Sequence, residues 1–188
     1  MIIFTVEVIA VSKIIAFKAN SNLLIDVTHS KREGYYTMPS NHYHDHYEIY
    51  YLLSGERNYF IKDEIYSIKE GDLVLINKND IHKTIDAAVP YHERLLIDFK
   101  EEFICTNSNE EIEYLLGCFE TDRPIIRLKA SDQVIVKDLI NNMLQEQLLK
   151  KSGYTISLKA YLLQLLIVIN RIVERKEQIP ADVDIDTS

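Results

Sequence analysis

Metal-ligand side chains recur at even positions in one short stretch, His42, His44, His46 and Glu48. Alternate side chains of an extended strand share a face, so a single strand can point all four the same way. His82 follows on a later strand candidate. Three imidazole nitrogens, from His42, His44 and His82, and a Glu48 oxygen suit divalent iron, manganese, nickel, copper or zinc. The same pocket can equally hold a small organic ligand.

The residues beside these candidates extend the predicted ligand-binding pocket. Tyr50 shares parity with Glu48 and is expected to point inward, and Thr84 has the same relation to His82. His46 has no place in the ligand set and is expected on the pocket wall or rim. The predicted ligand-binding set is therefore His42, His44, Glu48, Tyr50, His82 and Thr84. The many tyrosines of this region can stack a sugar or an aromatic ligand, although strand packing explains them equally well.

Short apolar runs separated by turn residues are expected to position this pocket. They predict strands at 23–27, 47–53, 58–61, 65–68, 73–76, 82–85 and 94–99. Turns are expected at Ser54-Gly55 and Gly71-Asp72. Regular short strands of this kind favour an all-β sandwich or barrel.

The hydrophobic period then changes to that of helices. Helices are expected over 110–119, from Ser131 to about 151 with Ile135, Leu139 and Met143 buried, and from Ser157 to Lys176. In the last, apolar residues alternate steps of four and three, which is a heptad seam. The seam, expected at the interface of a two-fold homodimer, consists of Leu158, Leu162, Leu165, Ile169 and Ile172.

Composition excludes several classes of protein. The 188 residues carry a net charge of −8 and no long run of lysine and arginine, so the surface should repel nucleic acid. The apolar N-terminus lacks a basic region and is too short to span a bilayer, so we expect no membrane association. Cys105 and Cys118 lack metal-type spacing and fit a reducing, cytoplasmic location.

With these residues in place, the chain resembles the N-terminal sensor half of an AraC-type transcription regulator. The resemblance rests on HDHYE at 44–48, YYLLSG at 50–55, YSIKEGDLVLI at 66–76 and DIH at 80–82. It implies a mainly β fold with C-terminal helices, namely a cupin-like (double-stranded β-helix or jelly-roll) barrel followed by an antiparallel helix pair. The implied division is an N-terminal arm at 1–21, the barrel at 22–105, a helical dimerisation region at 106–178 and the start of a linker at 179–188.

The resemblance also implies a function. The domain would bind a small-molecule effector, with a sugar as one candidate. Through it the domain would control DNA binding by a C-terminal helix-turn-helix half. The sequence given stops at Ser188, before such a half, so it represents either a cut at the linker or a stand-alone sensor. We expect no catalytic residues and no obligatory cofactor. The one cofactor that the predicted ligand set could hold is a divalent transition metal. The alternative is a stand-alone metal-binding cupin protein or a metal-dependent cupin enzyme of dioxygenase or isomerase type.

One cupin motif departs from its usual form in this chain. Gly71 and His82 hold their places, but Asn77 stands where the motif has proline and Asn79 where it has glycine. Because asparagine tolerates a left-handed backbone, Asn79 is expected to make the turn.

Overall fold

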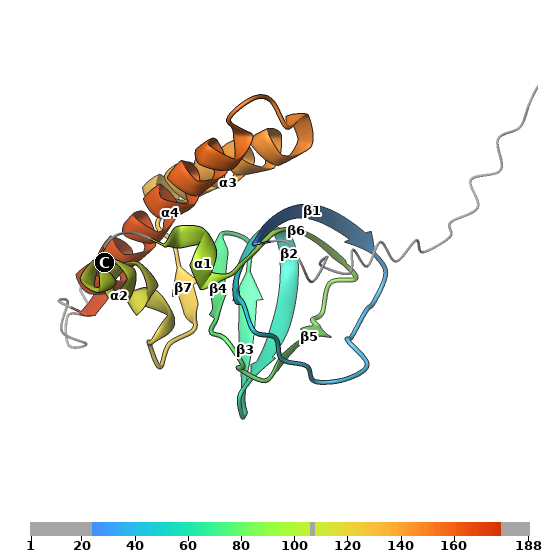
Figure 1. The fold of residues 1–188 in the computed structure, drawn as a ribbon. Coiled ribbons are helices and arrows are strands. Elements are labelled where there is room, and N and C mark those ends of the chain that lie inside the picture. The colour runs from blue at the N-terminus through green and yellow to red at the C-terminus, as the bar shows by residue number, and fades with distance from the viewer. Residues whose placement is uncertain (1–23, 106–107, 178–188) are drawn as a thin grey trace, which may run out of the picture.

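The computed structural model describes residues 24–105 and 108–177, so the predicted arm at 1–21 and linker at 179–188 lie outside the described residues. A seven-stranded antiparallel sheet wraps into a barrel, and helices cover one side of it (Figure 1). The strands are β1 (Ile25–Glu33), β2 (Tyr47–Ile61), β3 (Glu64–Lys69), β4 (Asp72–Ile76), β5 (His82–Asp86), β6 (Tyr91–Phe99) and β7 (Ile125–Arg127). The helices are α1 (Glu101–Ile104), α2 (Asn109–Leu116), η1 (Gly117–Phe119), α3 (Ala130–Leu149) and α4 (Tyr154–Glu177).

Strand β2 is the central strand of the barrel and pairs with four others. Its first half pairs with β4 and β6, and its second half pairs with β3 and β5, with a bulge between Leu52 and Ser54. The sequence predicted two strands here with a turn at Ser54-Gly55, which is wrong. Gly55 instead lets two strands approach closely, because its φ is +90° and a Cβ there would lie 2.2 Å from the backbone oxygen of Tyr91.

Alternation along β2 divides the apolar residues into two cores. Tyr47, Ile49 and Tyr51 belong to the larger core that the sheet shares with the helices. Tyr50 belongs to the smaller core, which fills the barrel between its two sheets together with residues such as Tyr59. Both faces of this half of β2 are buried, as the run of apolar side chains requires.

The turn that carries His82 forms as predicted. Asn79 adopts φ +65°, the left-handed conformation that the motif glycine would take. Asn77 accepts a hydrogen bond from the backbone N–H of Lys78 at 2.7 Å and donates to Glu120 Oε1 at 3.0 Å. The side chain of Asn77 therefore fixes the turn where the motif has proline.

The helix pair is antiparallel, and α3 contacts both α4 and strand β1 (Figure 1). Met143 is buried as expected, but the rest of the buried face of α3 differs from the prediction. Val136 and Ile140 are 0% exposed, whereas Ile135 is 48% exposed and Leu139 is only partly buried. Strand β7 was not expected in the region 106–178. It pairs with β4 and extends the sheet toward the helices.

The heptad seam of α4 faces the protein's own core. Leu158, Leu162, Leu165, Ile169 and Ile172 are all between 0 and 3% exposed in the single chain. Packed this way they offer no surface to a second chain, because barrel and helix residues of the larger core already cover them.

Helix α4 is also long and apolar enough, by composition, to cross a membrane. The stretch that meets this test is Tyr154–Lys176, and less than half of it is buried. One face of α4 packs into the larger core, and further apolar residues of α4 face outward. Both together account for its apolar composition.

Candidate functional site

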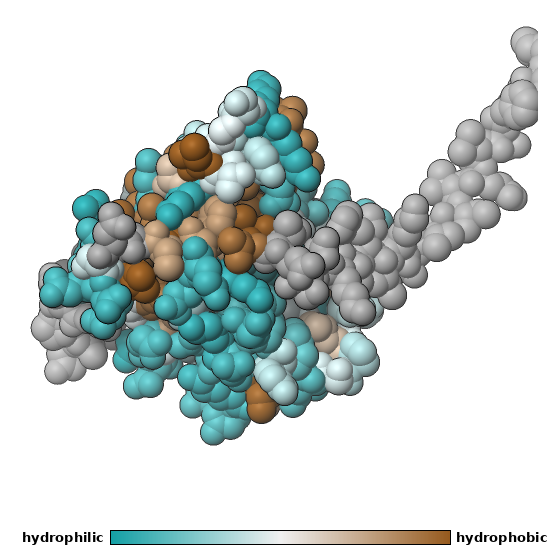
Figure 2. All heavy atoms as spheres, in the orientation of Figure 1, coloured by the Kyte–Doolittle hydropathy of each residue, from teal (hydrophilic) through white to brown (hydrophobic). Residues whose placement is uncertain are grey.

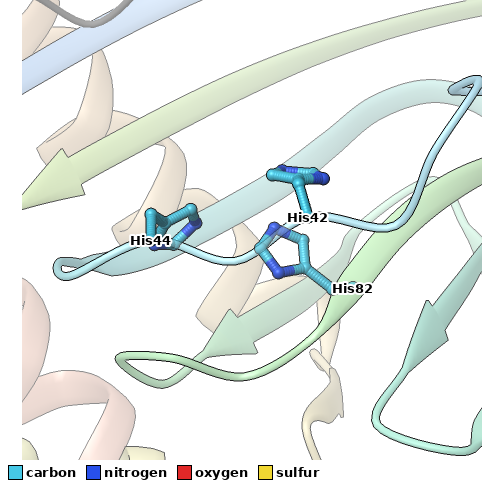
Figure 3. A group of neighbouring side chains, drawn as sticks. All are labelled: His42, His44 and His82. Carbon is cyan, nitrogen blue, oxygen red and sulfur yellow. The ribbon is translucent and has the colours of Figure 1, made fainter.

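A pair of backbone hydrogen bonds brings His42 beside His82. The N–H of each residue donates to the carbonyl of the other, at 3.1 and 2.9 Å, so the segment before β2 lies along β5. His44 follows two residues later, and ligand nitrogens of the three histidines lie within 4.8 Å of one another (Figure 3). The sequence predicted a single strand from His42 to Glu48. In the structure β2 begins only at Tyr47, and it is the convergence of loop and strand that assembles the group.

Backbone carbonyls orient two of the rings. His44 Nδ1 lies 2.9 Å from the carbonyl oxygen of His46, and His82 Nδ1 lies 2.8 Å from that of Asp80. A hydrogen bond to a carbonyl requires the proton on Nδ1, so in the neutral rings Nε2 carries the free lone pair. This is the arrangement by which proteins prepare histidine for a metal.

Glu48 completes the group from β2. Its Oε2 lies 3.5 Å from His44 Nε2 and 3.7 Å from His82 Nε2, and its Oε1 accepts the hydroxyl of Tyr59 at 3.0 Å. Burial raises the pKa of Glu48, but hydrogen bonds and positive charge from the His44 and His82 rings outweigh it and hold the pKa well below the ordinary value, which requires a proton between each Nε2 and the carboxylate. The carboxylate is therefore ionised at neutral pH.

These four side chains form an acceptor-rich site. Within the described residues, His42 Nδ1, His44 Nε2 and His82 Nε2 are buried and have no hydrogen-bond partner. Lone pairs that face one another and a carboxylate need a cation or a proton between them. A divalent transition metal fits this set, since three imidazoles and a carboxylate are ligands that such metals accept. Bound there, it would supply Lewis acidity or a fixed positive charge, and the chain's own residues would orient it.

His46 stands beside this group rather than within it. Its ring stacks on that of His44, with centroids 3.8 Å apart and planes 7° apart, and its Nε2 lies 3.6 Å from Asp98 Oδ1. Burial lowers the pKa of His46, but the nearby Asp98 outweighs this and raises it. The predicted place of His46, on the wall of the site, agrees with this stacking.

Tyr50 and Thr84 line the barrel interior, as their parity predicted. Tyr50 is 0% exposed and packs edge-to-face on Tyr59 with centroids 5.1 Å apart. Thr84 lies opposite Tyr59 in the register of β5 against β2 and is 5% exposed. Their role in ligand binding stays a prediction.

The sequence reasoning missed Tyr59 and a second polar group at another part of the interior. Counting alternate residues along an uninterrupted β2 would place the side chain of Tyr59 outside the barrel. The bulge at Leu52/Ser54 shifts the alternation by one residue, so Tyr59 points inward. The second group includes Arg57, which is 2% exposed and bonds Asp86 Oδ1 at 2.9 Å, and His92, which is 6% exposed. One signal was readable: Arg94 and Asp98 share a face of the strand candidate 94–99 while Leu95, Ile97 and Phe99 share the other, which separates polar from apolar sides; His92 lies before that candidate.

A barrel of antiparallel strands with this histidine and glutamate group defines the cupin-like class, here with a C-terminal helix pair. Residues 26–96 match the family model described as the AraC-like ligand binding domain. The resemblance found in the sequence is therefore confirmed over the barrel. No curated protein matches the sequence closely enough to indicate a relationship.

Several solved structures are similar to this chain, and one of them shares the fold over most of it. Apo ToxT K231A from Vibrio cholerae strain SCE256 aligns with a TM-score of 0.55 and 16% identity, covering 87% of this chain and 61% of that one. ToxT from V. cholerae O395 bound to (E)-4-(8-methylnaphthalen-1-yl)but-3-enoic acid aligns at 0.47 and 15% identity, covering 63% and 48%. An RmlC-like cupin from Methanocaldococcus jannaschii aligns at 0.37 and 20% identity, covering 40% and 69%. The first alignment extends beyond the barrel, and this chain spans about three fifths of the ToxT chain it matches.

Proposed function

We propose that this chain is the effector-sensing and dimerisation domain of an AraC-type transcription regulator. The observation that carries the proposal is the match of residues 26–96 to a ligand-binding domain of that type. The shared fold with ToxT over 87% of the chain supports including the helix pair. The protein would act in the cytoplasm, through a helix-turn-helix half that follows this sequence.

The effector is a small molecule held inside the barrel. It would contact the His42–Glu48 segment, His82, Tyr50 and Thr84, whose side chains face the interior or its opening. An effector that binds one arrangement of barrel and helices more tightly shifts the population toward it. The attached DNA-binding half would respond to that shift, and no enzymatic step is needed.

The homodimer would form through the outward face of the helix pair, since the heptad seam is buried. Ile156 on α4 is 77% exposed, and Val134 and Leu148 on α3 are 61% and 66% exposed. Figure 2 shows apolar residues gathered over the helical layer, while the barrel on that view is largely hydrophilic. A second copy that covers this face would remove these side chains from water.

A second candidate is a metal-binding cupin protein, with or without enzymatic activity. The specific observation favouring it is the convergence of His42, His44 and His82, whose facing nitrogens have no donor within the described residues. A resident metal is also compatible with the sensor function, as part of the effector site. Turnover of a substrate, lost together with the metal in His44→Ala, would place the protein among the enzymes.

Native mass spectrometry of the protein purified without chelators tests both candidates. It reports subunit number, metal mass and any organic adduct in one measurement. For the sensor function, residues 1–188 would be fused to a DNA-binding domain that needs dimerisation, with a reporter gene as readout. The proposal would be contradicted if the protein is a monomer and the reporter stays silent with every metal and organic adduct that mass spectrometry finds.

A further inference from the structure

Arg94 carries a charge on the interior side of the barrel wall that the described residues do not pair. It lies on β6 opposite Leu52 of β2 and Ser30 of β1, on the strand face that also carries Leu96 of the smaller core. Its Nε donates to Ser30 Oγ at 2.9 Å, and its guanidinium lies 5.4 Å from the ring centroid of Tyr50. Among the residues that the structure describes, no carboxylate oxygen lies within 4.0 Å of its nitrogens. A partly buried guanidinium without a counterion is costly, because arginine stays protonated in proteins.

The hydroxyl of Tyr50 is a second unused donor nearby. The side chain is 0% exposed, and its hydroxyl has no hydrogen-bond partner in the described part of the chain. Leu52, Val74 and Leu96 belong to or pack against the same apolar cluster as its ring, while Arg94, Arg57 and Glu48 act on the hydroxyl by charge. A buried hydroxyl left unpaired costs free energy unless a ligand accepts from it.

Three arginines gather at this part of the interior. Arg32 and Arg57 lie near His92, whose pKa is lowered to about 4 by burial and then by Arg57, Arg94 and Arg32. Asp86 is already engaged by the guanidinium of Arg57, at 2.9 Å. The inward carboxylates Glu48 and Asp98 lie against histidines. Against the effect of burial, their charges help to raise the pKa of Arg94, but neither has an oxygen within 4.0 Å of its nitrogens. Among the described residues, Arg94 and Arg32 therefore have no carboxylate in direct contact.

We propose that Arg94 and the Tyr50 hydroxyl bind the carboxylate of a small organic acid inside the barrel, with its apolar body against Leu52 and Leu96. The inference rests on the proposed function and names the chemical class of its effector. An arginine fork matches the two oxygens of a carboxylate, and a tyrosine hydroxyl adds a donor. A neutral sugar fits this place less well, because its hydroxyls would meet donors without acceptors and leave the charge of Arg94 unpaired.

The test compares acids with their uncharged amides on the whole chain. Benzoate and octanoate are the probes, benzamide, octanamide and D-glucose are the neutral comparisons, and calorimetry measures each Kd. We expect the carboxylates to bind and the neutral compounds to bind at least about tenfold more weakly. Arg94→Gln and Tyr50→Phe should each weaken carboxylate binding by about ten- to a hundredfold. Arg123→Gln, which removes an exposed arginine elsewhere, should leave it unchanged.

The Tm of each variant without ligand shows whether it folds. If the charge of Arg94 is unpaired, the Tm of Arg94→Gln should fall no further than that of Ser30→Ala, which removes only the hydrogen bond to Arg94. A larger fall would mean that the fold already compensates the charge, and would overturn the inference. So would carboxylate binding that survives Arg94→Gln, or the failure of both acids to bind. If D-glucose or an amide binds regardless of Arg94, the carboxylate inference fails while the sensor function stands.

Discussion

The side-chain amide of Gln147, near the end of α3, pairs with Val27 of β1 as a neighbouring strand would. Gln147 Oε1 accepts the N–H of Val27 at 2.8 Å, and Gln147 Nε2 donates to the carbonyl of Val27 at 2.7 Å. The same Nε2 donates to Asp26 Oδ1 at 2.9 Å. Since β1 is at the edge of the sheet order, the amide satisfies backbone groups that would otherwise be free. It also ties the helix pair to a strand whose inner face bonds Arg94 through Ser30.

Replacing Gln147 by alanine should weaken the attachment of α3 to the barrel. Hydrogen bonds to both backbone groups of Val27 are lost, so we expect the free energy of unfolding to fall by about 1–3 kcal/mol. Urea unfolding measures this change. Gln145→Ala, on an exposed position of the same helix, is the matched control and should have little effect. Equal stability of the two variants would mean that the Gln147 bonds contribute nothing.

Zinc should stabilise the wild-type chain through the histidine and glutamate group. At a free concentration a hundredfold above Kd, binding adds about 3 kcal/mol to the free energy of unfolding, which a thermal melt detects. His44→Ala and His82→Ala should abolish the shift, because each removes one Nε2 ligand. His29→Ala, on the exposed side of β1, should keep it. If zinc, iron and manganese all leave the wild-type Tm unchanged, the group does not bind these metals, and an organic ligand remains the candidate.

Stability should fall at mildly acidic pH because of His92. Its pKa is lowered from 6.5 to about 4 in the fold by burial and by the nearby arginines. Between these two values the unfolded chain binds a proton that the folded chain does not, so stability is full above pH 6.5 and declines as pH falls toward 4. The loss should reach about 3 kcal/mol. In His92→Gln this slope should be flatter when urea unfolding is followed across that range, whereas His29→Gln should retain it.

Alanine at Gly55 should cost far more than alanine at Gly34. Both glycines have a left-handed backbone, with φ of +90° and +93°, so both substitutions carry a strain of about 1–2 kcal/mol. A Cβ at Gly34 meets nothing within 4 Å, whereas one at Gly55 lies 2.2 Å from a backbone oxygen of β6. Thermal melts of the two variants separate the two effects. Similar Tm values would show that β2 and β6 can move apart at no cost.

A charge on the outward helical face should break the proposed homodimer. Ile156→Glu places a carboxylate on a residue of α4 that is 77% exposed in the single chain, so a folded monomer tolerates it and a covered interface does not. Sedimentation velocity should show a shift from dimer to monomer. Ile65→Glu on β3, at 66% exposure and on the barrel, is the control and should leave the subunit number unchanged. A dimer that survives Ile156→Glu would place the interface elsewhere.

The sequence by itself determined the class of fold, because short apolar runs with turn residues and a later change of period leave few architectures. It also identified His42, His44, Glu48 and His82 as one group, since ligand types at alternate positions are informative even when the strand is not regular. The turn at Asn79 was readable for a local reason, the tolerance of asparagine for positive φ.

Only the tertiary structure decided which faces meet. The bulge at Leu52/Ser54 and the backbone contact at Gly55 turn Tyr59 toward Glu48, which parity along a straight strand denies. The heptad seam of α4 has a spacing that serves a partner helix or the chain's own core equally well, and packing against the barrel selected the core. Nothing in the sequence distinguished Arg94 from other strand arginines. Only the pairing of β1, β2 and β6 shows that, within residues 24–105 and 108–177, no carboxylate contacts it directly. Pairing between residues far apart in sequence decides such contacts, and local patterns carry no record of it.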